Sequence, residues 1–289
     1  MPVAARFGPA GAGQSFYDEG YKSSAQVPEY LAALGLTAFE YQCGRGVNIG
    51  MEAARKLGAL CRERGVAVSL HAPYYISLAS PEEEKRCRSV DYILQSAAAV
   101  AAMGGDRIVV HAGGSGSASR GEMLALARET MRAALQALDD AGLARIHICP
   151  ETMGRSGRLG DLDDVLSLCE LDKRMIPCLD FGHLNAREQG SLHTAEDYAA
   201  LLGRVERALG AGRLRSFHAH FSRIQYGKSG EVKHLTFSDK LYGPPHEPLM
   251  KLIARRGLSP VVICESAGTQ AEDALMMQRA YRAYVTGQE

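Results

Sequence analysis

The chain has 289 residues, 46% of them hydrophobic, and its 33 basic and 33 acidic side chains give a formal net charge of zero. This length and hydrophobic content allow a large buried core in one or two domains. The charge balance neither requires nor excludes a nucleic-acid partner, because a local basic patch does not show in the total. No apolar run approaches the roughly 20 residues of a membrane span, and the start of the chain lacks the apolar segment of a signal peptide.

The seven cysteines are scattered and include no Cys-x-x-Cys pair. This spacing argues against a disulfide framework and against a zinc knuckle. Cys61, Cys149, Cys178 and Cys264 lie in apolar segments, where we expect them to be small core residues. Together with the absence of a recognisable signal pattern, the cysteines predict a reducing, cytoplasmic setting.

Short segments rich in β-branched or aromatic residues alternate with longer segments of helical apolar spacing. The predicted strands lie, in chain order, within residues 3–8, 38–43, 66–73, 107–114, 145–153, 175–183, 214–222 and 260–266. The clearest predicted helices are 51–65, 90–104 and 124–142, each of which ends at a glycine, and 271–285. Eight repeated strand–helix units predict a closed TIM (β/α)8 barrel, a single α/β domain over residues 1–289. A doubly wound open sheet is the alternative.

In such a barrel the functional groups gather at the carboxyl ends of the strands. Six consecutive predicted strands, from the third to the eighth, end in side chains that commonly bind metals. These are His71, His111, Glu151, Asp180 with His183 just beyond it, His218 or His220, and Glu265. His234 follows in the loop after the seventh strand, from which it could fold back over the same rim. The sequence therefore predicts one cluster of imidazoles and carboxylates at the mouth of the barrel.

Imidazole with carboxylate is typical of zinc sites, although manganese and iron accept similar ligand sets. The candidates are too many for one four-coordinate ion, so we expect two or three ions that share bridging carboxylates. Paired ions clamp the attacking and leaving oxygens of a displacement at phosphorus and lower the pKa of a bound water. The cluster therefore favours phosphodiester hydrolysis. A barrel with polar strand ends and no metal is the alternative.

The chain resembles the endonuclease IV family of apurinic/apyrimidinic (AP) endonucleases, also called deoxyribonuclease IV, from about Phe39 to Glu265. The most specific segments are 71–114 (HAPYYISL…VVHAGG), 151–168 (ETMGRSGRLGDLDDVLSL) and 178–186 (CLDFGHLNA). The resemblance implies a zinc-dependent TIM barrel that hydrolyses the DNA backbone 5′ to an abasic site in base excision repair. It also implies double-stranded DNA with abasic sites as the partner, no membrane, and a monomer.

The resemblance also implies three ligand sets. The first is His71, His111 and Glu151; the second is Glu151, Asp180, His220 and Glu265; the third is His183 and His234 with an aspartate. That aspartate is missing, because the family's Asp-Arg-His reads Val232-Lys233-His234 here, and Glu231 is one place off. The family's His-x-Asn-Asp reads His220 to Arg223 (HFSR), a second departure. We prefer His220 to His218 because it keeps this register.

The resemblance also suggests contacts with DNA. Tyr74 matches a tyrosine that contacts the DNA at the lesion, and Arg45 loosely matches an arginine that enters the duplex. Arg155 and Arg158, in the glycine-rich loop after Glu151, are expected to contact phosphates. The alternatives are a tyrosine that merely covers the barrel and arginines that are ordinary solvated surface groups.

Two other functions remain open. Isomerases and epimerases of the xylose isomerase-like barrels hold one divalent ion with Glu, Asp, His and Glu, and Glu151, Asp180, His220 and Glu265 satisfy that set. In such an enzyme the two glutamates would exchange protons with a carbon beside a carbonyl. The additional histidines favour the nuclease, in which Glu151 would bridge two ions and Glu265 would orient the attacking water. A metal-stabilised binding protein without turnover is the third interpretation.

Overall fold

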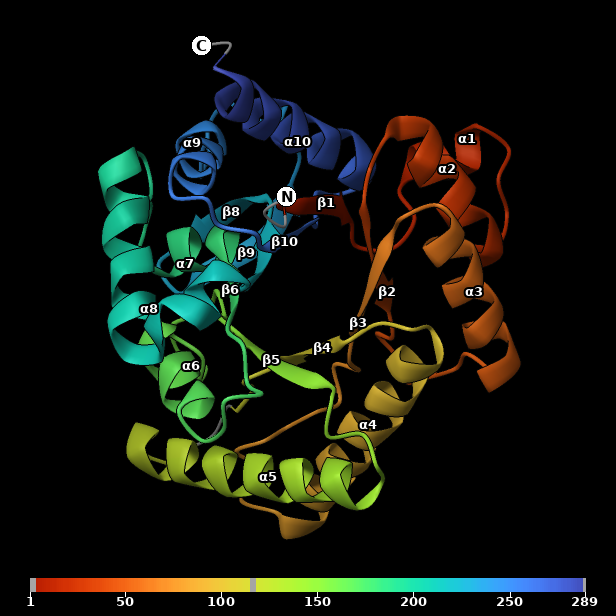
Figure 1. Ribbon diagram of the computed structural model, residues 1–289. Coiled ribbons are helices and arrows are strands. Elements are labelled where there is room, and N and C mark those ends of the chain that lie inside the picture. The colour runs from red at the N-terminus through yellow and green to blue at the C-terminus, as the bar shows by residue number, and fades with distance from the viewer. Residues whose placement is uncertain (1–3, 115–117, 288–289) are drawn as a thin grey trace.

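The computed structural model describes residues 4–114 and 118–287, and eight parallel strands form a barrel at its centre (Figure 1). The strands are β1 Arg6–Pro9, β2 Ala38–Gln42, β3 Ala67–His71, β4 Arg107–His111, β5 His147–Glu151, β6 Cys178–Asp180, β7 His218–Phe221 and β10 Val261–Cys264. Their order around the sheet is β1-β10-β7-β6-β5-β4-β3-β2, which follows the chain. The predicted TIM barrel is confirmed, and each of the eight predicted strands contains or overlaps one of these strands.

The barrel closes between its first and second strands. The backbone N–H of Thr37 donates to the carbonyl of Phe7, and that of Gly11 donates to the carbonyl of Glu40, both at 2.9 Å. A Cβ atom at Gly8 would lie 1.7 Å from the first carbonyl oxygen of β2. Glycine at this position therefore allows β1 and β2 to approach closely enough to complete the barrel.

The helices surround the strands as an outer layer (Figure 1). They are α1 Gln14–Asp18, α2 Val27–Leu34, α3 Met51–Glu63, α4 Glu83–Ala102, α5 Arg120–Asp140, α6 Leu162–Cys169, α7 Phe181–Arg187, α8 Ala195–Arg215, α9 Glu247–Arg255 and α10 Gln270–Thr286, with a 3-10 turn at Ser24–Gln26. Gly65, Gly104 and Gly142 follow α3, α4 and α5 with φ of 69°, 77° and 68°, as the sequence predicted for helix ends. Among residues 4–114 and 118–287, no helix combines the length and apolar character needed to cross a bilayer.

The connection between β7 and α9 is a hairpin, not the plain loop that we expected. Its strands are β8 Arg223–Gly227 and β9 Gly230–Leu235, which pair antiparallel and pack against α7. Gly230 pairs with Arg155 in the loop after β5, and a Cβ at Gly230 would lie 2.1 Å from the carbonyl oxygen of Gly154. This close contact attaches the hairpin to the rim of the barrel, where it brings Glu231 and His234 to the carboxyl ends of the strands.

The inside of the barrel carries several ionisable side chains, whereas the space between strands and helices is apolar. Strand side chains alternate between the two sides. On β7, Ala219 and Phe221 belong to the large apolar core, while His218 and His220 point inward and are fully buried. Glu40, on β2, is also fully buried inside the barrel. This alternation carries ionisable groups into the centre of the molecule without breaking the apolar layer that stabilises it.

Candidate metal centre

The carboxylate of Glu151, at the end of β5, lies at the centre of the site and is fully buried. Its Oε2 atom lies 3.2 Å from Nε2 of both His71 and His111. Its Oε1 atom lies 3.2 Å from Nδ1 of His220 and 3.4 Å from Nδ1 of His183. One carboxylate therefore contacts imidazoles from β3, β4, β7 and α7, and it belongs to two of the candidate ligand groups.

The structure brings all eight predicted ligands together in three groups, and within each group the ligand atoms lie within 4.8 Å of one another. The groups are His71, His111 and Glu151; Glu151, Asp180, His220 and Glu265; and His183, Glu231 and His234. The first two are the sets that the sequence predicted. The third contains Glu231, which supplies a carboxylate where the expected aspartate is missing. That these groups bind metal stays a prediction.

Asp180 has one oxygen in a structural role and one oxygen unpaired. Its Oδ1 atom caps α7 by accepting the backbone N–H of His183 at 2.7 Å. Its Oδ2 atom is buried and has no hydrogen-bond partner among the described residues. Nδ1 of His183 is only 3.1 Å from Oδ2, but it is bonded to the carbonyl of Thr152. A buried carboxylate oxygen without a donor is costly unless a cation binds it, so this orphaned atom fits a metal ligand.

Backbone carbonyls fix the tautomers of two histidines. Nδ1 of His71 lies 2.8 Å from the carbonyl oxygen of Ala72, and Nδ1 of His183 lies 3.0 Å from that of Thr152. A carbonyl can only accept, so Nδ1 carries the hydrogen and Nε2 of the neutral ring presents a lone pair. Nε2 of His71 faces Glu151, and Nε2 of His183 faces Oε2 of Glu231 at 3.4 Å. Metal-binding histidines are commonly oriented in this way by a second hydrogen bond.

The electrostatics of the cluster favour bound positive charge. Burial raises the pKa of Glu151, but the facing His220 and His111 hold it well below its usual value. Burial lowers the pKa of His71, yet its contact with Glu151 raises it to about 9. Burial acts in the same direction on His183, and Asp180 with Glu151 raises its pKa to about 10. The carboxylate of Glu151 is therefore ionised, and protons or divalent cations must neutralise it.

Glu231 and His234 are three residues apart on β9, and in a regular strand they would point to opposite faces. The hairpin has a register shift, since Gln225 pairs with Lys233 but Tyr226 pairs with Glu231. The extra residue is Val232, and such a bulge resets the alternation of side chains. Nε2 of His234 lies 3.9 Å from Oε1 of Glu231 as a result. The bulge explains how Glu231, one place before the expected aspartate, comes to face His234.

Ser222 orients His234 from the other side. Its Oγ atom lies 2.9 Å from Nδ1 of His234, which leaves Nε2 of that ring to face Glu231. Ser222 stands within the HFSR segment that departs from the family pattern, and its side chain is buried. A residue that differs from the family pattern, Ser222, therefore contacts the third group of ligands.

The site opens into a cavity of about 490 Å³ whose lining includes Tyr74, Arg155 and Arg158 beside the ligands. Tyr74 is 61% exposed, and its ring centroid lies 5.7 Å from that of His71 and 5.4 Å from that of His111. Both arginines are exposed. These three side chains are placed where a polyanion could reach them, and their contact with DNA stays a prediction.

Arg45 lies outside the lining of this cavity. It is exposed in a turn after β2, next to Gly44, whose carbonyl accepts the backbone N–H of Tyr74 at 3.3 Å. The turn therefore borders the mouth of the barrel. The structure does not bring Arg45 into the cluster of predicted ligands.

Arg187 is a residue that sequence reasoning missed. From the last turn of α7 its guanidinium donates to the carbonyls of Met153, Arg155, Ser156 and Arg158, at 2.6 to 3.2 Å. It therefore holds the loop that presents the two arginines of the cavity. A basic residue near a helix end gives no sequence signal for this role.

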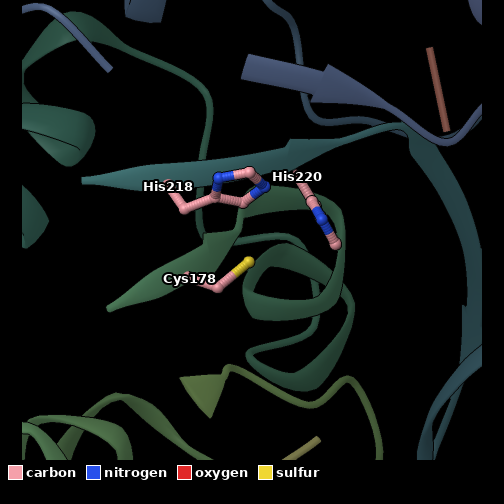
Figure 2. A group of neighbouring side chains, drawn as sticks. All are labelled: Cys178, His218 and His220. Carbon is pink, nitrogen blue, oxygen red and sulfur yellow. The ribbon is translucent and has the colours of Figure 1, made fainter. Parts of the chain in front are cut away.

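Glu40 was also missed, and its only signal is a charged residue inside the apolar segment AFEYQC. It lies one layer below the metal groups, where Oε2 is 2.9 Å from Nε2 of His218 and Oε1 is 2.9 Å from Nε2 of His220. Figure 2 shows His218 and His220 on the same strand, with Cys178 projecting toward them from β6. His220 thus belongs to the metal groups, while burial lowers the pKa of the deeper His218 to about 4 and keeps it neutral.

Two relatives by sequence cover most of the chain. An uncharacterized protein of Methanocaldococcus jannaschii is 31% identical over 274 residues, which are 94% of this chain and 95% of that protein. A protein named probable endonuclease 4, from Symbiobacterium thermophilum, is 28% identical over 270 residues, with 87% of this chain and 92% of that protein covered.

Two solved structures show the same fold. A D-tagatose 3-epimerase-like protein has a TM-score of 0.70 and 21% identity, with 90% of this chain and 93% of that chain covered. Endonuclease IV from Thermus thermophilus has a TM-score of 0.65 and 24% identity, with 93% of this chain and 96% of that chain covered. A family model described as the xylose isomerase-like TIM barrel matches residues 28–281. The chain belongs to the xylose isomerase-like TIM barrel family.

Proposed function

We propose that this protein is a metal-dependent AP endonuclease that hydrolyses the phosphodiester 5′ to an abasic site in double-stranded DNA. The observation that carries the proposal is the set of ligands beyond the quartet Glu151, Asp180, His220 and Glu265. A one-metal epimerase needs only that quartet, whereas here His71 and His111 add a second group and His183, Glu231 and His234 add a third. The relative named probable endonuclease 4 supports the same activity.

The three groups would hold two or three divalent ions, with zinc preferred by the imidazole-rich donor set and manganese or iron as alternatives. Such ions supply Lewis-acid stabilisation of a phosphate and a lowered pKa of water. The orphaned Oδ2 of Asp180 and the Nε2 atoms of His71 and His183, which face carboxylates, are consistent with this occupancy.

Activation of the water and binding of the DNA would fall to side chains of this protein. Glu265 is the carboxylate of the quartet that is partly exposed, at 16%, and it lines the cavity. It would orient the attacking water and accept its proton at a carboxylate oxygen. The bond from phosphorus to the 3′ oxygen of the preceding nucleotide would break, and that oxygen would take a proton from solvent. Arg155 and Arg158 would bind the phosphates beside the lesion, and the exposed ring of Tyr74 would stack in the gap left by the missing base.

The direct test is to incubate the purified protein with a duplex that contains one abasic site. We expect cleavage 5′ to that site, lost on addition of a chelator and restored by zinc. Replacing Glu265 by Gln should retain bound metal and slow cleavage by roughly 100-fold or more, the usual contribution of a catalytic base. An unmodified duplex of the same sequence is the control substrate, and it should stay intact.

The second candidate function is a sugar isomerase or epimerase, because the quartet that such enzymes use is complete here. A panel of ketose sugars incubated in parallel separates the two functions. Metal-dependent sugar turnover with an intact abasic duplex would contradict the proposed nuclease.

A further inference from the structure

Glu40 is a fully buried carboxylate on β2, a strand that supplies none of the predicted metal ligands. Its two oxygens face different groups. Oε2 accepts a hydrogen bond from Oγ of Ser69 at 2.9 Å and lies 2.9 Å from Nε2 of His218. Oε1 lies 2.9 Å from Nε2 of His220 and accepts from the side-chain amide of Gln42 at 3.2 Å. The charge of Glu40 is therefore held directly beneath the metal centre.

His220 connects Glu40 to that centre. Nδ1 of its ring lies 3.2 Å from Oε1 of Glu151 and 3.5 Å from Oε1 of Glu265, both in the second ligand group. Nε2 of the ring is buried and has no aligned hydrogen-bond partner among the described residues. The oxygen of Glu40 is the anionic acceptor that faces this nitrogen at 2.9 Å.

We propose that Glu40 is a positioning residue that keeps a hydrogen on Nε2 of His220, so that Nδ1 presents its lone pair to the second metal group. A neutral imidazole has one N–H, and the carboxylate oxygen of Glu40, 2.9 Å from Nε2, favours the tautomer that carries the hydrogen on that nitrogen. A carboxylate behind a metal-binding histidine also makes the ring a stronger ligand. Glu40 thereby acts on the metal through His220 without touching it.

Cys178 is the competing neighbour of His220, since the ligand atoms of Cys178, His218 and His220 also lie within 4.8 Å of one another. Figure 2 shows the sulfur of Cys178 directed from β6 toward the two rings on β7. A thiol is a weak acceptor, whereas a carboxylate accepts strongly and carries a full charge. Glu40, and not Cys178, is therefore the neighbour that favours a hydrogen on Nε2 of His220.

The test compares Glu40→Gln with Ser69→Ala. The first change keeps the shape of the side chain but introduces an amide that can donate as well as accept, so the preference for one tautomer is lost. The second removes a hydrogen bond to Oε2 of the same carboxylate and leaves the contact with His220 in place. Metal-free proteins would be titrated with zinc in competition with a chromophoric chelator, and their thermal unfolding would be recorded without metal.

We expect Glu40→Gln to lower the affinity for one zinc ion by roughly 10–100-fold, the usual effect of losing a hydrogen-bond partner behind a metal-binding histidine. Ser69→Ala should bind zinc with the affinity of the wild type. Unchanged zinc affinity in folded Glu40→Gln protein, with or without a lower unfolding temperature, would overturn the inference. The inference rests on the metal centre of the proposed function but not on DNA as substrate. A wild-type protein that binds no zinc would overturn both, whereas zinc binding without DNA cleavage would overturn the proposed function alone.

Discussion

Glu231 gives the third group of ligands its negative charge. Its Oε2 atom lies 3.4 Å from Nε2 of His183, and its Oε1 atom lies 3.9 Å from Nε2 of His234. The other nitrogen of each histidine is engaged by a hydrogen bond, with the carbonyl of Thr152 and with the hydroxyl of Ser222. Two imidazoles without a carboxylate would bind a divalent ion weakly, so the affinity of this group depends on Glu231.

Replacing Glu231 by Gln should therefore reduce the zinc bound per chain by one ion after dialysis against a weak chelator. Elemental analysis of the dialysed protein measures the change. Val232→Ala is the matched control, because Val232 occupies the place of the family's aspartate, is 54% exposed and belongs to no ligand group among the described residues. Equal zinc contents in the two variants would contradict the role of Glu231.

The sequence predicted the residues at strand ends and missed those whose role depends on local geometry. His71, His111, Glu151 and Asp180 could be predicted because a parallel barrel places the ends of its strands at one rim. Glu40 could not, since a buried acid within a strand has no motif of its own. The sequence showed Glu231 one residue before the place of the expected aspartate, but not that it would face His183 and His234. A bulge that shifts side-chain direction by one residue leaves no clear pattern in a sequence.

At the scale of elements, the loop between β5 and α6 is held by its neighbours. The guanidinium of Arg187, on α7, donates to four of its carbonyls, and Gly230, on the hairpin, pairs with Arg155. Arg155 and Arg158 themselves are exposed. The partly buried guanidinium of Arg187 thus determines where the exposed side chains of Arg155 and Arg158 lie beside the cavity.

Arg187→Ala should free this loop without removing a ligand of the metal groups. Hydrogen bonds to a charged donor contribute about 1.5–3 kcal/mol each, so we expect at least roughly tenfold faster cleavage by trypsin after Arg155 and Arg158. Mass spectrometry of a digestion time course measures the two cuts. Arg204→Ala, which removes an exposed ion pair with Asp163, should digest like the wild type. Equal rates in both variants would show that Arg187 does not hold the loop.

The eight strands were predicted, but residues 181–183, expected at the end of the sixth strand, begin α7, and the hairpin after β7 was not expected. The strands and the helices that end at Gly65, Gly104 and Gly142 follow from apolar spacing and from turn residues. The hairpin β8–β9 was taken for a loop, because the repeating strand–helix pattern led us to expect a helix next. Its alternating residues and the turn between Gly227 and Gly230 are a signal that the regular repeat concealed.

At the scale of the whole molecule, the barrel separates its charged centre from its apolar layer. Eight repeated units were enough to predict the architecture. The closure between β1 and β2 was not predictable in detail, since it depends on the missing side chain at Gly8 and on the approach of one backbone to another. A barrel closed in this way excludes reagents from its interior as well as from the layer beneath the helices.

The reactivity of the cysteines can measure how well the barrel excludes reagents. Six of them are buried, and Cys87, on α4, is exposed. Burial raises the pKa of Cys43, Cys61, Cys149 and Cys264 to about 12, and the thiolate is the reactive form. At pH 8 a thiol with that pKa is ionised to roughly one part in 10,000, and raising the pH to 9 still leaves it almost wholly protonated.

Iodoacetamide at pH 8 should therefore modify the native protein at Cys87 alone, and all seven cysteines once the chain is unfolded in denaturant. Peptide mass spectrometry locates each modified residue. Metal-free and zinc-loaded protein should give the same pattern, because the six buried thiols are shielded by the barrel and its helices and do not depend on bound ions. Native labelling of Cys178 or Cys149 at a rate near that of Cys87 would mean that the interior is open to solvent, and the closed barrel described above would be wrong.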